Sequence, residues 1–102
     1  TCLANDLGYE HVFSLPLGRY AQAGDLLFAV SSSGSSASIL NAAQWAISHG
    51  MFVVTLSGFA PDNPLRPLGN QNIYVPSTSY GTVEIAHLAI LHAVLDDLTG
   101  SQ

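Results

Sequence analysis

The sequence predicts an α/β protein with a three-layer, doubly wound parallel sheet. Short apolar runs alternate with segments of helical periodicity, and the connections between them are short. The run LLFAV at 26–30 is continuously apolar, as expected for a parallel strand that helices cover on both faces. Strands that alternate with helices through short loops form parallel sheets with right-handed crossovers. We expect one domain, residues 1–102.

Four strands and two helices are expected. The strands are placed at 11–15, 26–30, 52–56 and 72–76. The first helix is expected from Ser36 to His49, because apolar residues recur there at helical spacing, with Ser35 or Ser36 as N-cap and Gly50 just past the end. A long helix follows from about Thr82 to Leu98.

The remaining segments are expected to connect these elements. The opening TCLANDLGYE resembles the end of a helix that stops at Gly8. The proline-rich residues 59–69, with Asp62 and Arg66, are expected to form a solvated connector with room for one helical turn.

Composition limits the function. The chain has 102 residues, of which 48% are apolar and 9% charged, so a folded domain is expected. It has no lysine, two arginines and a net charge of −5, which argues against a nucleic-acid surface. The single cysteine, Cys2, allows no internal disulfide. We find no signal sequence or membrane span, and expect a cytoplasmic protein.

The stretch AVSSSGSSAS places serines directly after a predicted buried strand and before a predicted helix. A flexible linker would not lie between two such elements. The carboxyl end of a parallel strand next to a helix N-terminus is a common anion site. We expect the loop to bind a phosphate through Ser31, Ser32, Ser33, Gly34 and Ser36. The alternative is one capping serine among small turn residues. No Walker or dinucleotide glycine motif is present.

The block GDLLFAVSSSGSSASILNAAQWAISHGMFVVTLSG resembles the sugar isomerase (SIS) domain, and within it the phosphoheptose isomerases. The resemblance covers nearly the whole chain. It implies a five-stranded parallel sheet of flavodoxin-like order, a homodimer or homotetramer, and sugar-phosphate binding by the serines. Ser32 stands where the family often has threonine.

The resemblance also implies residues that this sequence does not contain. Members of the family have N-terminal helices, a first strand and a glycine-rich loop before the point that corresponds to Thr1. We therefore expect a C-terminal portion that is inactive by itself, with the missing strand belonging in the middle of the sheet.

The last helix supplies the predicted catalytic residues. The family presents a glutamine and, eight residues later, a histidine, and this spacing matches Glu84 and His92. A histidine suits proton transfer near neutral pH. His87 is interpreted as a core histidine. The change to Glu84, and Gly81 where many members carry aspartate, depart from the family pattern.

The resemblance further suggests that Glu84 and His92 are ligands of an optional zinc ion. Nothing else in the sequence requires a cofactor. The expected function is isomerisation of sedoheptulose 7-phosphate to a heptose 7-phosphate for bacterial surface polysaccharide. Two alternatives stay open: an isomerase for another phosphosugar, and a non-catalytic SIS module that binds a phosphosugar or, like the DnaA-associating relatives, a protein. Trp45 is expected to pack internally or to contact a second subunit.

Overall fold

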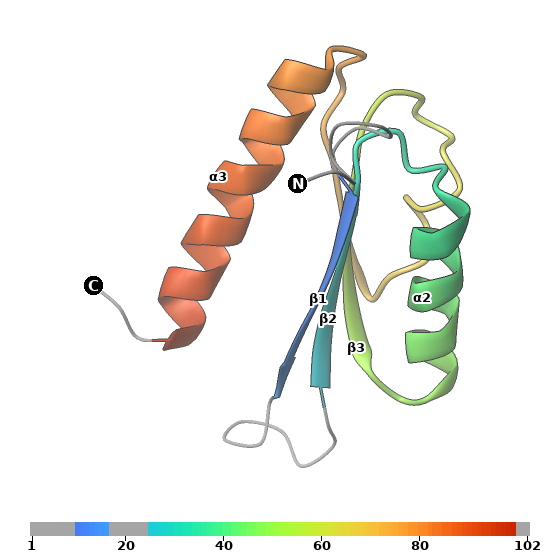
Figure 1. Ribbon diagram of the computed structural model, residues 1–102, viewed down its shortest axis with the longest axis vertical. Helices are drawn as coiled ribbons and strands as arrows, with labels where there is room; N and C mark the ends of the chain where they lie inside the picture. The colour runs from blue at the N-terminus through green and yellow to red at the C-terminus, as the bar shows by residue number, and fades with distance from the viewer. Residues whose placement is uncertain (1–9, 17–24, 100–102) are drawn as a thin grey trace.

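A central sheet lies between two helices in the computed structural model, which describes residues 10–16 and 25–99. Helix α2 (Ala37–Ser48) covers one face and helix α3 (Tyr80–Thr99) the other (Figure 1). This arrangement confirms the predicted three layers. The helix end expected before Gly8, and Cys2, lie outside the described residues.

Each expected strand is present, with bounds that differ by a few residues from those predicted. The strands are β1 (Glu10–Pro16), β2 (Asp25–Ser31), β3 (Phe52–Ser57) and β4 (Gln71–Tyr74). Helix α2 ends at Ser48, and Gly50 follows it with φ of +79°, the left-handed conformation expected just beyond a helix.

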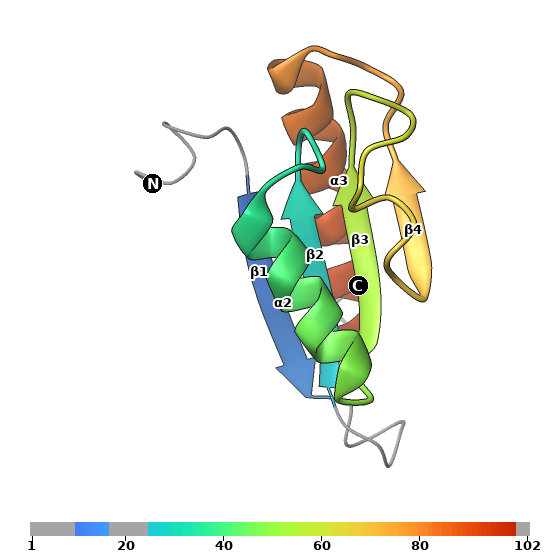
Figure 2. The same cartoon turned by 90° about the vertical axis from the view of Figure 1, so that its right-hand side faces the viewer.

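The described strands lie in the order β1-β2-β3-β4. Strands β2, β3 and β4 are parallel, as predicted. With α2 in front, β3 lies to the right of β2, which is the right-handed crossover (Figure 2). A flavodoxin-type order, 2-1-3-4-5, gives this same succession when its first strand is left out.

Strand β1 departs from the all-parallel prediction because it runs antiparallel to β2, from Glu10 opposite Ser31 to Pro16 opposite Asp25. The physical reason lies in the length of the connection. Residues 17–24 are fewer than the dozen or so that a parallel crossover needs. In the structure, β1 therefore occupies the edge of β2 where the missing strand of the family was expected.

The core has two parts, one on each face of the sheet. Alternate residues of β2 point to opposite faces: Phe28 and Val30 join a cluster that includes Leu91 of α3, whereas Leu27 and Ala29 join one that includes Ile39 and other residues of α2. A strand buried on both faces explains why the LLFAV run shows no polar alternation.

The loops that follow β2, β3 and β4 all leave the same edge of the sheet (Figure 2). Because the three strands are parallel, this carboxyl edge brings together the serine-rich residues 31–36, the turn at 57–63 and residues 77–79. Within the described residues, no helix is both long and apolar enough to cross a membrane.

Candidate functional site

The serine loop, residues 31–36, turns sharply at Gly34. Gly34 has φ of +69°, a conformation that a residue with a side chain adopts only with strain. Its N–H donates to the Oγ and to the carbonyl oxygen of Ser31, at 3.1 and 3.2 Å. Ser31 and Ser32 are buried. These two serines therefore form the inner wall of the turn rather than its open surface.

The open side of the serine loop borders a depression of about 450 Å³. It is lined by Glu10, Ser33, Ser35, Ser36, Ala37 and Ser38. Of the predicted phosphate ligands, Ser33 and Ser36 face this depression. Ser31 and Ser32 are not among the lining residues, and the sequence analysis assigned no phosphate contact to Ser35 or Ser38.

The N-terminus of α2 opens onto the same depression. Ser36 occupies the N-cap position, but its side chain makes no capping hydrogen bond; its Oγ lies 3.2 Å from that of Ser38. The first N–H groups of a helix have no partner within the helix. The expected capping by a serine side chain is thus absent at Ser36, and these N–H groups and hydroxyls are available to an anion.

One carboxylate would repel an anion bound in this depression. Glu10 lines the depression, and the Ser31 hydroxyl donates to its Oε2 at 3.5 Å. A negative charge beside a bound phosphate is unfavourable. The position of Glu10 follows from the antiparallel pairing of β1, which sets Glu10 opposite Ser31, and it was not foreseen from the sequence.

The proline-rich loop after β3 is less solvated than predicted. Asp62 and Arg66 are exposed, as expected, but Asn63 and Leu65 are buried. Successive turns, rather than a helical turn, carry the chain through this segment. Leu65 packs in the cluster under α2, so the loop belongs to the core on that face and lies against the serine loop.

Asn63 was missed in the sequence analysis. The signal for it was its place before Pro64, because asparagine followed by proline is typical of a turn that the asparagine side chain stabilises. Its Oδ1 accepts the N–H of Arg66, three residues on, at 2.9 Å.

Helix α3 contains two histidines in opposite environments. His87 is fully buried, and its Nε2–H donates to the carbonyl oxygen of Ser57 at 2.9 Å, while its Nδ1 has no hydrogen-bond partner. Burial lowers the pKa of His87 below its usual 6.5, and the hydrogen bond to Ser57 partly opposes this effect. The interpretation of His87 as a core histidine is confirmed.

Glu84 and His92 lie elsewhere on α3. Glu84 is half-buried and His92 is exposed. Neither lines the depression at the serine loop, and α3 covers the face of the sheet opposite α2 (Figure 1). Within the described part of the chain, the predicted catalytic residues therefore do not border the depression that Ser33 and Ser36 line.

The residues that were expected to hold zinc do not form a site by themselves. Among residues 10–16 and 25–99, no group of three or more histidine, cysteine, aspartate or glutamate residues is close enough to hold a metal ion. Zinc usually takes four ligands, or three with a water. Glu84 and His92 would supply two, so the described residues do not fit zinc.

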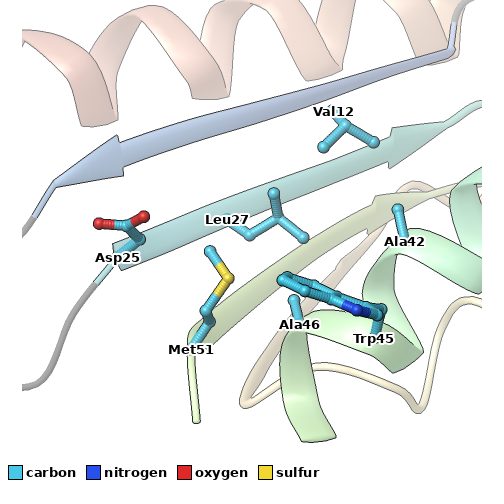
Figure 3. A pocket seen from close by; sticks show the side chains of 7 residues that line it. All are labelled: Val12, Asp25, Leu27, Ala42, Trp45, Ala46 and Met51. Atoms are coloured by element: carbon cyan, nitrogen blue, oxygen red, sulfur yellow. The ribbon is translucent and has the colours of Figure 1, made fainter. Parts of the chain in front are cut away.

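A second cavity of about 440 Å³ lies between α2 and the sheet, beside Trp45 (Figure 3). Trp45 is 59% exposed and stacks on His49, with 3.9 Å between ring centres. The remaining lining residues are Val12, Asp25, Leu27, Ala42, Ala46 and Met51. Its one charged lining group is a carboxylate, so this cavity is unsuited to a phosphate.

Known proteins resemble this chain over most of its length. The phosphoheptose isomerase of Cytophaga hutchinsonii is 40% identical over 96 residues, which are 93% of this chain and 50% of that protein. The phosphoheptose isomerase of Shewanella sediminis is 34% identical over 100 residues, 96% of this chain and 51% of that protein. No family model matches the sequence.

A solved structure supports the same relationship. The phosphoheptose isomerase of Francisella tularensis superposes with a TM-score of 0.61 and 28% identity, over 70% of this chain and 40% of that one. The chain spans about half the length of the curated relatives that it matches. Over that half, the chain resembles the phosphoheptose isomerases, as expected for a fragment of a member of that family.

Proposed function

We propose that the full-length protein is an aldose–ketose isomerase that acts on a phosphosugar, with sedoheptulose 7-phosphate as substrate. The observation that carries the proposal is the serine loop at the carboxyl end of β2, within a chain 40% identical to a phosphoheptose isomerase. A heptose 7-phosphate product would serve bacterial surface polysaccharide, and the reaction would take place in the cytoplasm.

The serine loop would bind the phosphate without a positively charged side chain. The unpaired N–H groups at the start of α2 and the hydroxyls of Ser33 and Ser36 point to this role. Ser31 would act by shaping the loop, because its Oγ already accepts the Gly34 N–H. Ser32 is buried and would have a similar supporting role.

His92 would move the proton. In this reaction a base removes a proton from C1 of the ketose and returns it to C2 of the enediol, while a hydroxyl proton passes between the oxygens on C1 and C2. The exposed ring of His92 is accessible to a substrate, in contrast to the buried ring of His87. An imidazole titrates near neutrality, as such a step requires.

Glu84 would assist as a second polar group on α3. It lies eight residues before His92, so about 12 Å along the helix axis separate the two Cα atoms. Further catalytic groups would come from residues beyond those described, since His92 does not line the depression at the serine loop.

The exposed apolar residues of α3 support a homo-oligomer, a dimer or a tetramer. Ile85 is 70% exposed, and Leu88 is also exposed. Large apolar side chains next to His92 are typical of a face that another subunit covers. A covering subunit would also enclose His92, which a proton-transfer site needs.

A second function, a non-catalytic module that binds a phosphosugar, is favoured by one observation. Glu84 and His92 lie apart from the depression at the serine loop, so that loop can bind a ligand without involving them. The chain itself offers no feature that selects among phosphosugars.

The experiment that separates the two functions uses the full-length protein with sedoheptulose 7-phosphate, with and without added zinc, and follows heptose 7-phosphate by NMR. The isomerase proposal expects turnover in the wild type and its loss in His92→Ala. Binding without turnover in the wild type, under both conditions, would instead support the binding module.

A further inference from the structure

Asn63 is a buried polar side chain in the loop after β3, and all of its hydrogen-bonding groups are used. Its Nδ2 lies 3.1 Å from the Ser57 Oγ and 3.0 Å from the carbonyl oxygens of Gly58 and Ala60. Its Oδ1 accepts the Arg66 N–H. Only 4% of Asn63 is exposed. A buried amide with this many partners has one fixed orientation.

The Asn63 side chain lies directly against the serine loop. A Cβ atom built on Gly34 would stand 2.0 Å from the Asn63 Oδ1 and 2.3 Å from its Cγ. The neighbouring Leu65 N–H donates to the Gly34 carbonyl oxygen at 3.0 Å. The loop that contains Asn63 therefore holds Gly34, the residue with the left-handed conformation, in place.

The same amide is connected to α3 through the end of β3. Ser57, whose Oγ accepts from Asn63, accepts the His87 Nε2–H at its carbonyl oxygen. At the next residue, a Cβ on Gly58 would lie within 3 Å of both the Val83 side chain and the Ser32 carbonyl oxygen. The turn 57–58 thus touches the serine loop on one side and α3 on the other.

We infer that Asn63 is a positioning residue for the phosphate site: its amide fixes Gly34, and with it the Ser33 and Ser36 hydroxyls, against the end of β3. The inference rests on the proposed phosphate site at the serine loop. Donors bind an anion well only when they are held in place beforehand. Asn63 does not line the depression, so it acts through Gly34 and not by touching the ligand.

Asn72 provides a matched control. It is also an asparagine in a side-chain network: its Oδ1 accepts the Thr55 hydroxyl and the Gly69 N–H, and its Nδ2 donates to the Gly69 carbonyl oxygen. It lies in β4, and its side-chain hydrogen bonds go to Thr55 and Gly69 rather than to the serine loop. Asn72→Ala should therefore destabilise the fold without disturbing the serine loop.

The test measures binding of inorganic phosphate and of sedoheptulose 7-phosphate to the full-length protein by isothermal titration calorimetry. Asn63→Ala should raise the Kd of both ligands roughly tenfold or more, because the loop donors lose their fixed positions. Asn72→Ala should change each Kd less than about twofold. Asn63→Ser keeps an acceptor for the Arg66 N–H, so it should fold even if Asn63→Ala does not. It should lose as much phosphate affinity as is expected for Asn63→Ala.

A double-mutant cycle separates positioning from general destabilisation. In a Ser36→Ala background, Asn63→Ser should weaken phosphate binding much less than it does in the wild type, because both changes act on the same donors. Equal affinities of Asn63→Ser and wild type, or fully additive effects in the cycle, would overturn the inference. Wild-type protein that binds neither ligand would overturn both the phosphate site and this inference. Binding without turnover would contradict only the isomerase proposal.

Discussion

The serine loop and the exposed face of α3 carry the two halves of the proposed site, and they differ in how the described chain supports them. The serine loop is held by Ser31, Asn63 and Leu65 through hydrogen bonds and close contacts. On α3, His92 is exposed, and so are the apolar residues Ile85 and Leu88. The difference indicates that the described chain orders the proposed phosphate loop through its own contacts, whereas His92, if it is catalytic, would need a covering partner to complete its surroundings.

The largest effect on stability is expected at Gly34, in the serine loop. Gly34→Ala places a Cβ against the Asn63 amide in a left-handed conformation. We expect it to lower the free energy of unfolding by about 2–5 kcal/mol, measured by urea denaturation. Gly50 also has a positive φ, but a Cβ atom there would meet nothing within 4 Å. Gly50→Ala should therefore cost only the backbone strain, about 1 kcal/mol. Equal losses at both glycines would show that Asn63 does not confine the loop.

The next effect separates the two histidines of α3. His87→Ala removes a buried ring and one of the two hydrogen bonds to the Ser57 carbonyl oxygen, which also accepts the Val75 N–H, so it should destabilise the fold by about 2–4 kcal/mol. His92→Ala, at an exposed position, should change the free energy of unfolding by less than about 0.5 kcal/mol. Thermal and urea unfolding of both variants checks this. A strongly destabilised His92→Ala would mean that His92 is structural.

A smaller effect concerns pH. Burial lowers the pKa of His87 in the folded state, so below pH 6.5 the unfolded state binds more protons than the folded state. Stability should be complete above that pH and fall as the pH decreases below it, by at most about 1.4 kcal/mol per pH unit. His87→Gln should remove this part of the slope, whereas His92→Gln should retain it. Urea unfolding between pH 7.5 and 5.5 provides the measurement, and an unchanged slope in His87→Gln would refute the assignment.

The smallest stability effect is expected at Ser36. Replacing a capping serine with alanine usually costs about 1 kcal/mol, but the Ser36 side chain makes no capping bond to α2. Ser36→Ala should therefore cost less than about 0.5 kcal/mol while it weakens phosphate binding. A full capping penalty, seen as a lower urea midpoint, would indicate that the hydroxyl serves the helix and not a ligand.

Periodicity predicted the helices, the three parallel strands and the place of the serine loop, because these depend on local patterns of burial. The predicted parallel direction of β1 was wrong, since its apolar residues fit either orientation and only the length of 17–24 decides between them. Asn63 looked like a loop residue because its burial depends on Gly34, which is distant in sequence.

Site residues were harder to predict than elements. A serine-rich motif indicates that hydroxyls gather, but not which of them face outward: Ser31 and Ser32 are buried, while Ser33 and Ser36 face the depression. The family resemblance, through its eight-residue spacing, pointed to Glu84 and His92, but it carries no information on what covers them in this chain. The burial of a side chain and what covers it depend on contacts between segments that are distant in sequence. Periodicity reflects only local patterns.

The most direct test of the account compares kcat and KM for the full-length protein with sedoheptulose 7-phosphate. We predict that His92→Ala lowers kcat by roughly 10²- to 10⁴-fold with little change in KM, and that Ser36→Ala raises KM with little change in kcat. A wild-type kcat in His92→Ala, or an unchanged KM in Ser36→Ala, would contradict the proposed roles of these two residues.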